Sequence, residues 1–236
     1  MWSLLRPLML FLILYLVFTY IFPVGKEVPH YPVYLLLGIV LWNYFTEVTT
    51  GGVASIVNKG DLLRKINFPR YVIVLAGSFS ALINLILNFV VIAVFMIIGH
   101  VSISLSALWM IPLIIELFIV SLSVSFLLSA MFVKYRDISY IWDVIIQAAF
   151  YATPILYPLT KISTAHPGVA KLMLINPLAQ IIQGARYSMI TKSTVTINSL
   201  YNNPLAVFIP LGLAAIVFVV AIAYFKKRSK FFAEEV

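Results

Sequence analysis

The chain has 236 residues, of which 63% are hydrophobic and 10% are charged, and its formal net charge is +8. A soluble domain of this length would need many more charged residues on its surface, so the composition excludes an ordinary soluble protein and predicts a membrane protein. The absence of cysteine excludes disulfide bonds and thiolate metal sites.

Six long apolar runs are separated by short stretches that collect the proline, glycine and charged residues. A helix needs roughly 20 apolar residues, each rising about 1.5 Å, to cross a hydrocarbon core. Such runs indicate helices rather than barrel strands, because each helix satisfies its own backbone hydrogen bonds in lipid. We predict an all-α, polytopic membrane protein with a single transmembrane domain over 1–236. Its six spans are expected at about 2–22, 33–57, 71–98, 107–133, 138–157 and 205–225.

The first run has a competing interpretation as a signal peptide. Its apolar stretch, 8–22, is at the upper length limit of the apolar region of a signal peptide. The flank that follows, from Pro23 to Glu27, lacks the small-x-small cleavage pattern. We therefore predict a retained first helix.

The loop after the second run carries a short amphipathic pattern. Asp61 can cap the start of a brief helix, and Pro69 would end it. One face would carry Leu62, Leu63 and Ile66, and the other Arg64 and Lys65. Two interpretations stay open, a docking element for a soluble partner and a basic loop that serves only to fix the topology.

The segment of about 158–190 is long for a loop and unusually apolar. Its two apolar pieces are separated at Asn176 and Pro177, and neither is long enough to span a membrane. We predict two short re-entrant helices on the outer side, between the fifth and sixth spans. An amphipathic cap lying on the outer surface is the alternative.

Acidic residues inside the predicted spans favour a functional interpretation, because a charged side chain in lipid is costly unless it faces protein or water. Glu47, Glu116 and Asp143 are these residues, although each could instead pair with an arginine, as Asp143 could with Arg136. Small residues, in contrast, are the usual contact surface between membrane helices. The fourth span carries such a stripe, at Ser121, Ser125 and Ser129.

The distribution of lysine and arginine predicts the orientation. If both termini are cytoplasmic, most of the 16 basic residues fall on the inner side: Arg6, Lys59, Arg64, Lys65, Arg70, Lys134, Arg136, Lys226, Lys227, Arg228 and Lys230. Basic inner loops facing anionic lipid account for the net charge, so no nucleic-acid partner is expected.

The sequence lacks the motifs of several enzyme and metal-binding classes. No Walker A loop or Gly-x-Ser-x-Gly elbow is present, and the histidines at 30, 100 and 166 have no metal-ligand spacing. We therefore expect a transport protein that binds no metal or cofactor, and not an enzyme.

Four groups of residues resemble one family in order and in place. They are Trp2-Ser3-Leu4-Leu5-Arg6-Pro7-Leu8, the loop from Leu63 to Arg70, the turn from Tyr135 to Ile138, and the region holding Thr153–Pro158, Asn176–Leu178 and Ala185–Tyr187. The chain thus resembles the permease subunit of type-2 ABC exporters for polysaccharides and polyol phosphates. Family members carry an amphipathic interfacial helix ahead of the first span. The sequence begins at Met1-Trp2, so the resemblance does not extend to that helix.

The resemblance implies a homodimer in the cytoplasmic membrane, bound to two copies of a separate ATPase that holds ATP and Mg. The substrate would be a lipid-linked glycan of the O-antigen, capsule or teichoic acid type. ATPase docking would use Asp61, Leu62, Leu63, Arg64, Lys65, Ile66, Phe68, Pro69 and Arg70, with Arg136 and Asp137 in an inner turn. The re-entrant region would include Pro154, Tyr157, Asn176, Pro177 and Arg186. Candidate channel-lining residues, including aromatic rings that could stack on sugars, are Tyr15, Tyr20, Trp42, Phe45, Glu47, Asp143, Gln147 and Tyr151.

Two alternatives from other classes stay open. An ion-coupled secondary transporter would use Glu47, Glu116 or Asp143 as its ion site, and would show inverted repeats, of which we find none convincing. A membrane-embedded transferase on lipid-linked sugars would need an acid/base cluster, whereas the acidic residues are scattered along the chain.

Overall fold

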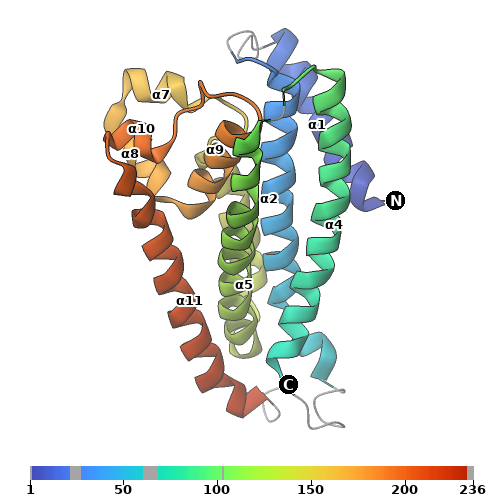
Figure 1. Cartoon of the computed structure of the whole chain (residues 1–236). Helices are drawn as coiled ribbons and strands as arrows, with labels where there is room; N and C mark the ends of the chain where they lie inside the picture. The colour runs from blue at the N-terminus through green and yellow to red at the C-terminus, as the bar shows by residue number, and fades with distance from the viewer. Residues whose placement is uncertain (1, 22–27, 61–68, 103, 233–236) are drawn as a thin grey trace.

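Helices form the secondary structure of the computed structural model, which describes residues 2–21, 28–60, 69–102 and 104–232. The long helices stand side by side, and a group of short helices sits at one end of the bundle (Figure 1). No strand occurs in these ranges. The all-α prediction is confirmed for the described part of the chain.

The helix α2 (Tyr31–Val53) lies at the centre of the bundle. It packs against α1 (Trp2–Leu16), α4 (Tyr71–Ile98) and α5 (Met110–Lys134). Pro32 occupies the first turn of α2, where a missing N–H costs nothing. Most α2 side chains are buried, in contrast to α4 and α11 (Phe208–Arg228), which leave many large apolar side chains exposed. Such apolar outer faces fit helices that contact lipid.

Among the described residues, four helical stretches are long and apolar enough to cross a membrane, at 31–53, 71–98, 105–134 and 204–231. The first predicted span is helical over 2–21 but combines two helix types, and the fifth is shorter than expected. The apolar part of α1 covers Pro7–Leu16, before a π-helical turn at Val17–Ile21. The helix α6 (Ile138–Ala152) has 15 residues, about 22 Å at the rise of an α-helix, against a hydrocarbon core of roughly 30 Å.

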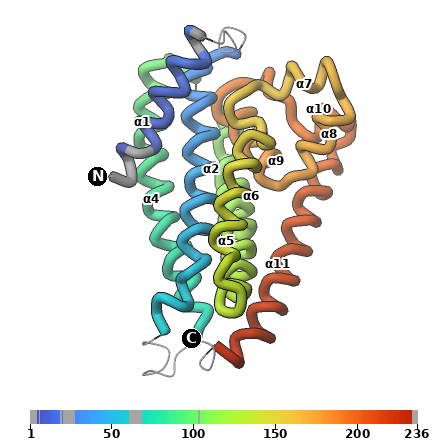
Figure 2. Tube along the Cα trace, turned by 180° about the vertical axis from the view of Figure 1, so that it is seen from behind, coloured from blue at the N-terminus to red at the C-terminus, as the bar shows by residue number. Residues whose placement is uncertain are grey.

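The fifth predicted span was drawn too long, because α6 ends at Ala152 and not near 157. Thr153 has extended backbone, and the residue before a proline disfavours the α conformation. The Thr153 N–H still donates to the Ala149 carbonyl at 2.9 Å, which closes the last turn. Figure 2 shows α6 running beside α2 and α5 toward the short helices.

The short helices between α6 and α11 are α7 (Leu159–Ala165), α8 (Pro167–Ile175), α9 (Pro177–Met189) and α10 (Ile197–Tyr201). The two predicted short helices correspond to α8 and α9, and α7 is additional. The Asn176 side chain accepts a hydrogen bond from the Leu178 N–H at 3.1 Å, so Asn176 and Pro177 separate α8 from α9. The depth of these helices in a membrane stays a prediction.

The serine stripe of α5 is a packing surface. Ser121, Ser125 and Ser129 are all buried. A Cβ atom built on Gly52 of α2 would lie 1.8 Å from the Ser125 Oγ, so the two backbones approach closely. This is the role predicted for small residues between membrane helices.

Candidate functional site

An aromatic seam joins α6 to α2. The Trp42 ring lies 5.8 Å from Phe150, and the Phe45 ring lies 6.2 Å from Trp142, each pair at a steep angle. The Trp142 indole N–H also donates to the Thr49 hydroxyl at 3.3 Å. Trp42 and Phe45 are each 5% exposed. The two aromatic residues of α2 that were predicted to line a channel therefore pack against α6.

The outward side of α6 is open and carries polar residues among exposed apolar ones such as Ile141 and Val144. Asp143, Gln147 and Tyr151 recur every four residues and are all exposed, whereas Ile146 is the one buried side chain of this helix. Asp143 makes no ion pair with Arg136 in the described structure. These three predicted residues thus share one accessible face. Tyr151 packs against the Phe150 ring at 5.4 Å but stays 70% exposed, so much of its ring is accessible to a ligand or a second protein surface.

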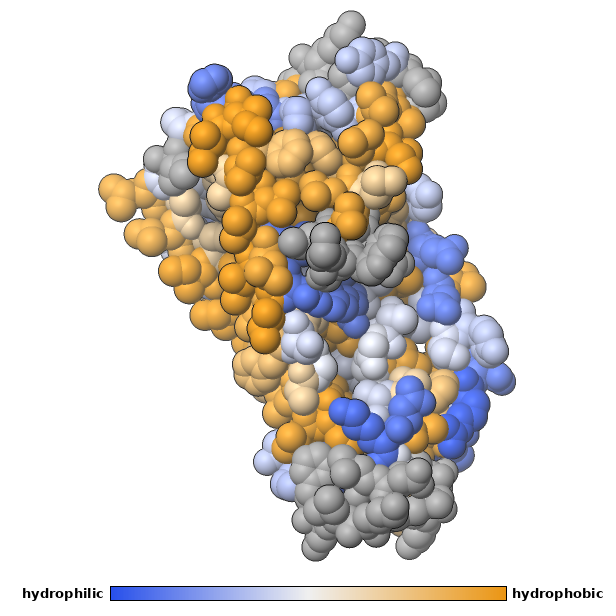
Figure 3. Space-filling view, turned by 90° about the vertical axis from the view of Figure 1, so that its right-hand side faces the viewer, coloured by the Kyte–Doolittle hydropathy of each residue, from blue (hydrophilic) through white to orange (hydrophobic). Residues whose placement is uncertain are grey.

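Glu47 lies on an exposed part of α2 and is bonded to α4. The Asn84 side-chain amide donates to the Glu47 Oε1 at 2.7 Å. Thr50 on the same face is also exposed, and Asn43 is half-buried. Figure 3 shows hydrophilic residues gathered on the lower right of one side of the molecule, next to a hydrophobic surface on the left.

The third acidic residue, Glu116 of α5, is buried at 8% exposure. Its Oε1 atom has no hydrogen-bond partner among the described residues. Glu47, Glu116 and Asp143 come from three different helices. Within the described ranges, no three histidine or acidic residues are grouped so that they could hold a metal ion.

The two tyrosines of the first predicted span have different surroundings. Tyr15 is half-buried and stacks on Phe11 with ring centroids 5.7 Å apart. Tyr20 is 77% exposed. Their predicted role in lining a channel stays a prediction.

Arg186 of α9 is completely buried and ties three segments together. Its Nε donates to the Tyr34 carbonyl of α2 at 3.0 Å. Its two terminal nitrogens each donate at 2.6 Å, one to the carbonyl of Pro154 and the other to that of Ile155, just beyond α6. Gly38 leaves room for this arrangement, because a Cβ atom there would lie 2.4 Å from Nη2. Carbonyls freed by the end of α6 thus gain a charged donor.

Arg186 is fully buried, and its side of the membrane stays a prediction. The side chain is enclosed by protein and does not face solvent. Two tyrosines strengthen the same region. The Tyr31 hydroxyl donates to the Leu156 carbonyl, and the Tyr157 hydroxyl to the Tyr151 carbonyl, both at 2.9 Å.

The far end of the bundle collects basic residues. The ends of α5 and α11 and the start of α4 meet there, and they carry Lys134, Arg70, Lys226, Lys227 and Arg228 (Figure 1). Arg70 donates to the Ser229 carbonyl, which links α4 to the residues after α11. Arg136 and Asp137 are exposed in the turn before α6, also at this end. Of the predicted docking loop, Pro69 and Arg70 are described, and 61–68 lie outside the described residues.

Several structural residues were missed from the sequence. Tyr34 and Gly38 complete the Arg186 site, and Trp142 and Phe150 complete the aromatic seam. A glycine four residues after Tyr34, in an otherwise bulky apolar helix, was the available signal for a close approach. The partner of that approach lies 148 positions along the chain and has no local signature.

Comparison with known proteins then decides the family. Residues 1–190 match the ABC-2 type transporter family. The chain belongs to this family. It is 31% identical over 183 residues to the O-antigen export system permease protein RfbA of Klebsiella pneumoniae, covering 77% of the chain and 69% of that protein. A protein with the same description from Myxococcus xanthus is 28% identical over 184 residues, with the same coverage of both chains.

Membership in the ABC-2 family makes the chain a multi-pass membrane transport subunit and implies an ABC ATPase as its partner. The resemblance inferred from the four sequence motifs is confirmed by the comparison.

Proposed function

We propose that the chain is the membrane-spanning subunit of an ATP-driven exporter for a lipid-linked polysaccharide of the O-antigen, capsule or teichoic acid type. The main supporting observation is the similarity of the chain, over 183 residues, to a permease described as part of an O-antigen export system. ATP and Mg would be bound by the ATPase, and the permease would supply the passage.

The exposed polar face of α6 supports this proposal. Asp143 and Gln147 are exposed on α6 among apolar residues such as Val144, and facing lipid would cost each of them a few kcal/mol. A homodimer would place this face toward a second copy or a water-filled passage. Glu47 and Tyr151, which are also exposed, would then contribute acidic and aromatic groups to the passage.

In the proposed topology, six segments cross the cytoplasmic membrane and both termini are cytoplasmic. The basic end of the bundle then faces the cytoplasm, which agrees with the positive-inside rule. The short helices α7 to α10 would lie on the outer side, with α8 and α9 re-entering the membrane. The six-helix unit would form one transmembrane domain.

Two ATPase copies would dock at the basic end, through the loop of 61–70 and the turn at Arg136 and Asp137. Leu63 would insert into a groove on the ATPase, while Lys65 would meet its rim. Buried apolar anchors carry more binding energy than rim charges, which solvent screens. The effects of replacing Leu63 and Lys65 should therefore differ.

The proposed function is tested by purifying the chain with its co-expressed ATPase. The chain alone should show no ATP hydrolysis, and the complex should hydrolyse ATP. Leu63→Asp should weaken the association by roughly 2 kcal/mol or more, while Lys65→Ala should cost less than about 1 kcal/mol. ATP hydrolysis by the chain alone would contradict the proposed function. Native-level ATPase binding by the Leu63→Asp variant would contradict the docking assignment.

A further inference from the structure

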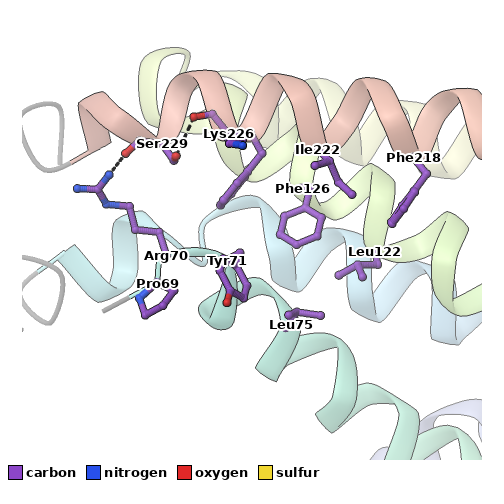
Figure 4. A pocket seen from close by; sticks show the side chains of 11 residues that line it. Pro69, Arg70, Tyr71, Leu75, Leu122, Phe126, Phe218, Ile222, Lys226 and Ser229 are labelled. Carbon is purple, nitrogen blue, oxygen red and sulfur yellow. Dashed lines mark hydrogen bonds between the residues drawn. The ribbon is translucent and has the colours of Figure 1, made fainter. Parts of the chain in front are cut away.

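A deep apolar groove opens between α4 and α11 at the basic end of the bundle. The two helices lie closest at that end and diverge away from it, and α5 forms the floor between them (Figure 4). The floor residues Leu122 and Phe126 are each 6% exposed. The cavity has a volume of about 810 Å³, within the roughly 300–1,000 Å³ range of small-ligand clefts.

The walls of the groove are suited to a hydrocarbon chain. Phe218 and Ile222 of α11 lie on one side, and Leu75 of α4 lies on the other. Phe218, Ile222 and Lys226 are spaced by four residues, so they share one face of α11. From Phe218 to Lys226 this face rises about 12 Å. The groove therefore runs along the bundle for about two helical turns.

Two cations stand at one end of this apolar groove. Lys226 is exposed, and Arg70 is half-buried beside the carbonyl of Ser229. Both line the cavity, and no acidic side chain is present among its described lining residues. The cations lie where α4 begins and α11 ends. In a membrane-spanning bundle, that level corresponds to the lipid headgroups, where basic residues attract anionic lipid.

We propose that this groove binds a phospholipid with an anionic headgroup. One acyl chain would lie against Leu122, Phe126 and Ile222, and the headgroup phosphate would contact Arg70 and Lys226. The inference goes beyond transport of the glycan and requires only that the bundle lie in a membrane. The charge at the groove mouth favours an anionic lipid over a zwitterionic one and over an apolar peptide segment.

Native mass spectrometry of the full-length chain in mild detergent tests this proposal. Phosphatidylglycerol and phosphatidylcholine with identical acyl chains are titrated separately, and the bound fractions are compared. The wild-type chain should bind phosphatidylglycerol preferentially. Arg70→Gln and Lys226→Gln should each lower that affinity about fivefold, since a basic residue near a membrane surface contributes on the order of 1 kcal/mol.

Matched variants separate the groove from general surface charge. Lys227→Gln combined with Lys230→Gln removes two exposed cations outside the groove and should leave the preference intact. Ile222→Trp should fill the groove and reduce binding of both lipids, whereas Ile216→Trp, on an exposed part of α11 away from it, should not. Equal binding of the two lipids by the wild type would overturn the proposal. So would equal losses in the groove variants and their controls, or a change of oligomeric state in Ile222→Trp with lipid binding unchanged.

Discussion

The guanidinium carbon of Arg186 lies 3.6 Å from the centre of the Tyr34 ring, while Nε of Arg186 donates to the carbonyl of the same residue. Tyr34 of α2 therefore contacts the Arg186 cation with both its ring and its backbone carbonyl. Further bonds to Pro154 and Ile155 join α9 to the chain after α6. Because Arg186 is fully buried, water does not compete for these acceptors, and the bonds should stabilise the packing of α9 against α2 and the chain after α6.

Arg186→Lys should destabilise the protein although it keeps the charge. A single ammonium group cannot reproduce the planar arrangement that reaches three carbonyl oxygens. Losing two charge-assisted bonds should cost roughly 3 kcal/mol. Thermal unfolding in detergent, followed by tryptophan fluorescence, measures the loss. Arg136→Lys, at an exposed position, is the control, and equal melting temperatures for the two variants would contradict the assigned role.

Gly38→Ala should also be destabilising, because its Cβ would lie 2.4 Å from Nη2 of Arg186 and 3.2 Å from Cζ. The added methyl should cost about 1–3 kcal/mol by overpacking. Gly51→Ala on the same helix meets nothing within 4 Å and should be neutral or slightly stabilising. In the Arg186→Lys background, the cost of Gly38→Ala should shrink, because the two residues are in contact. Additive effects on the melting temperature would argue against this contact.

Gly52→Ala tests the close approach of α2 and α5. The new methyl would overlap Ser125, with Oγ at 1.8 Å and Cβ at 2.9 Å, at a cost of about 1–3 kcal/mol. Adding Gly52→Ala to Ser125→Gly should cost clearly less than adding it to the wild type, because the overlapping side chain is gone. Unfolding measurements on the four proteins of this cycle decide the point. A full cost in both backgrounds would mean that the helices do not pack here.

The proposed topology can be read from thiol labelling, and the native chain contributes no background because it has no cysteine. In intact cells, a cysteine replacing His166 should react with an impermeant reagent. A cysteine replacing Lys227 should react only after the membrane is opened. Both native side chains are exposed in the structure. The reverse pattern would invert the orientation inferred from the basic residues.

Local sequence patterns were sufficient for the long helices. The predicted span 71–98 coincides with α4, and the breakers Asn176 and Pro177 correctly separate α8 from α9. The early end of α6 also had a local signal, since Thr153 precedes Pro154. That signal was overridden by the apolar residues that continue to Tyr157, because hydropathy alone does not detect a change in backbone conformation.

Side-chain surroundings were less predictable, because they depend on contacts between distant segments. The four-residue spacing of Asp143, Gln147 and Tyr151 agrees with their shared exposed face, whereas Pro154, expected on the same side, is buried beyond the end of α6. Trp42 and Phe45 were also predicted to line a channel, but both are buried. The side chains that bury them, Phe150 and Trp142, come from another helix. Whether the exposed face lines a passage depends on a second copy of the chain, which one sequence cannot position.

The most direct test of the proposed exporter is translocation in proteoliposomes that hold the chain, its ATPase and a lipid-linked glycan. Movement is followed by the access of an impermeant glycosidase to the sugar. We expect the accessible fraction to change only when ATP is present, and to be insensitive to a proton ionophore. Movement driven by a proton gradient without ATP would favour the secondary transporter instead. Covalent alteration of the glycan without movement would favour the transferase.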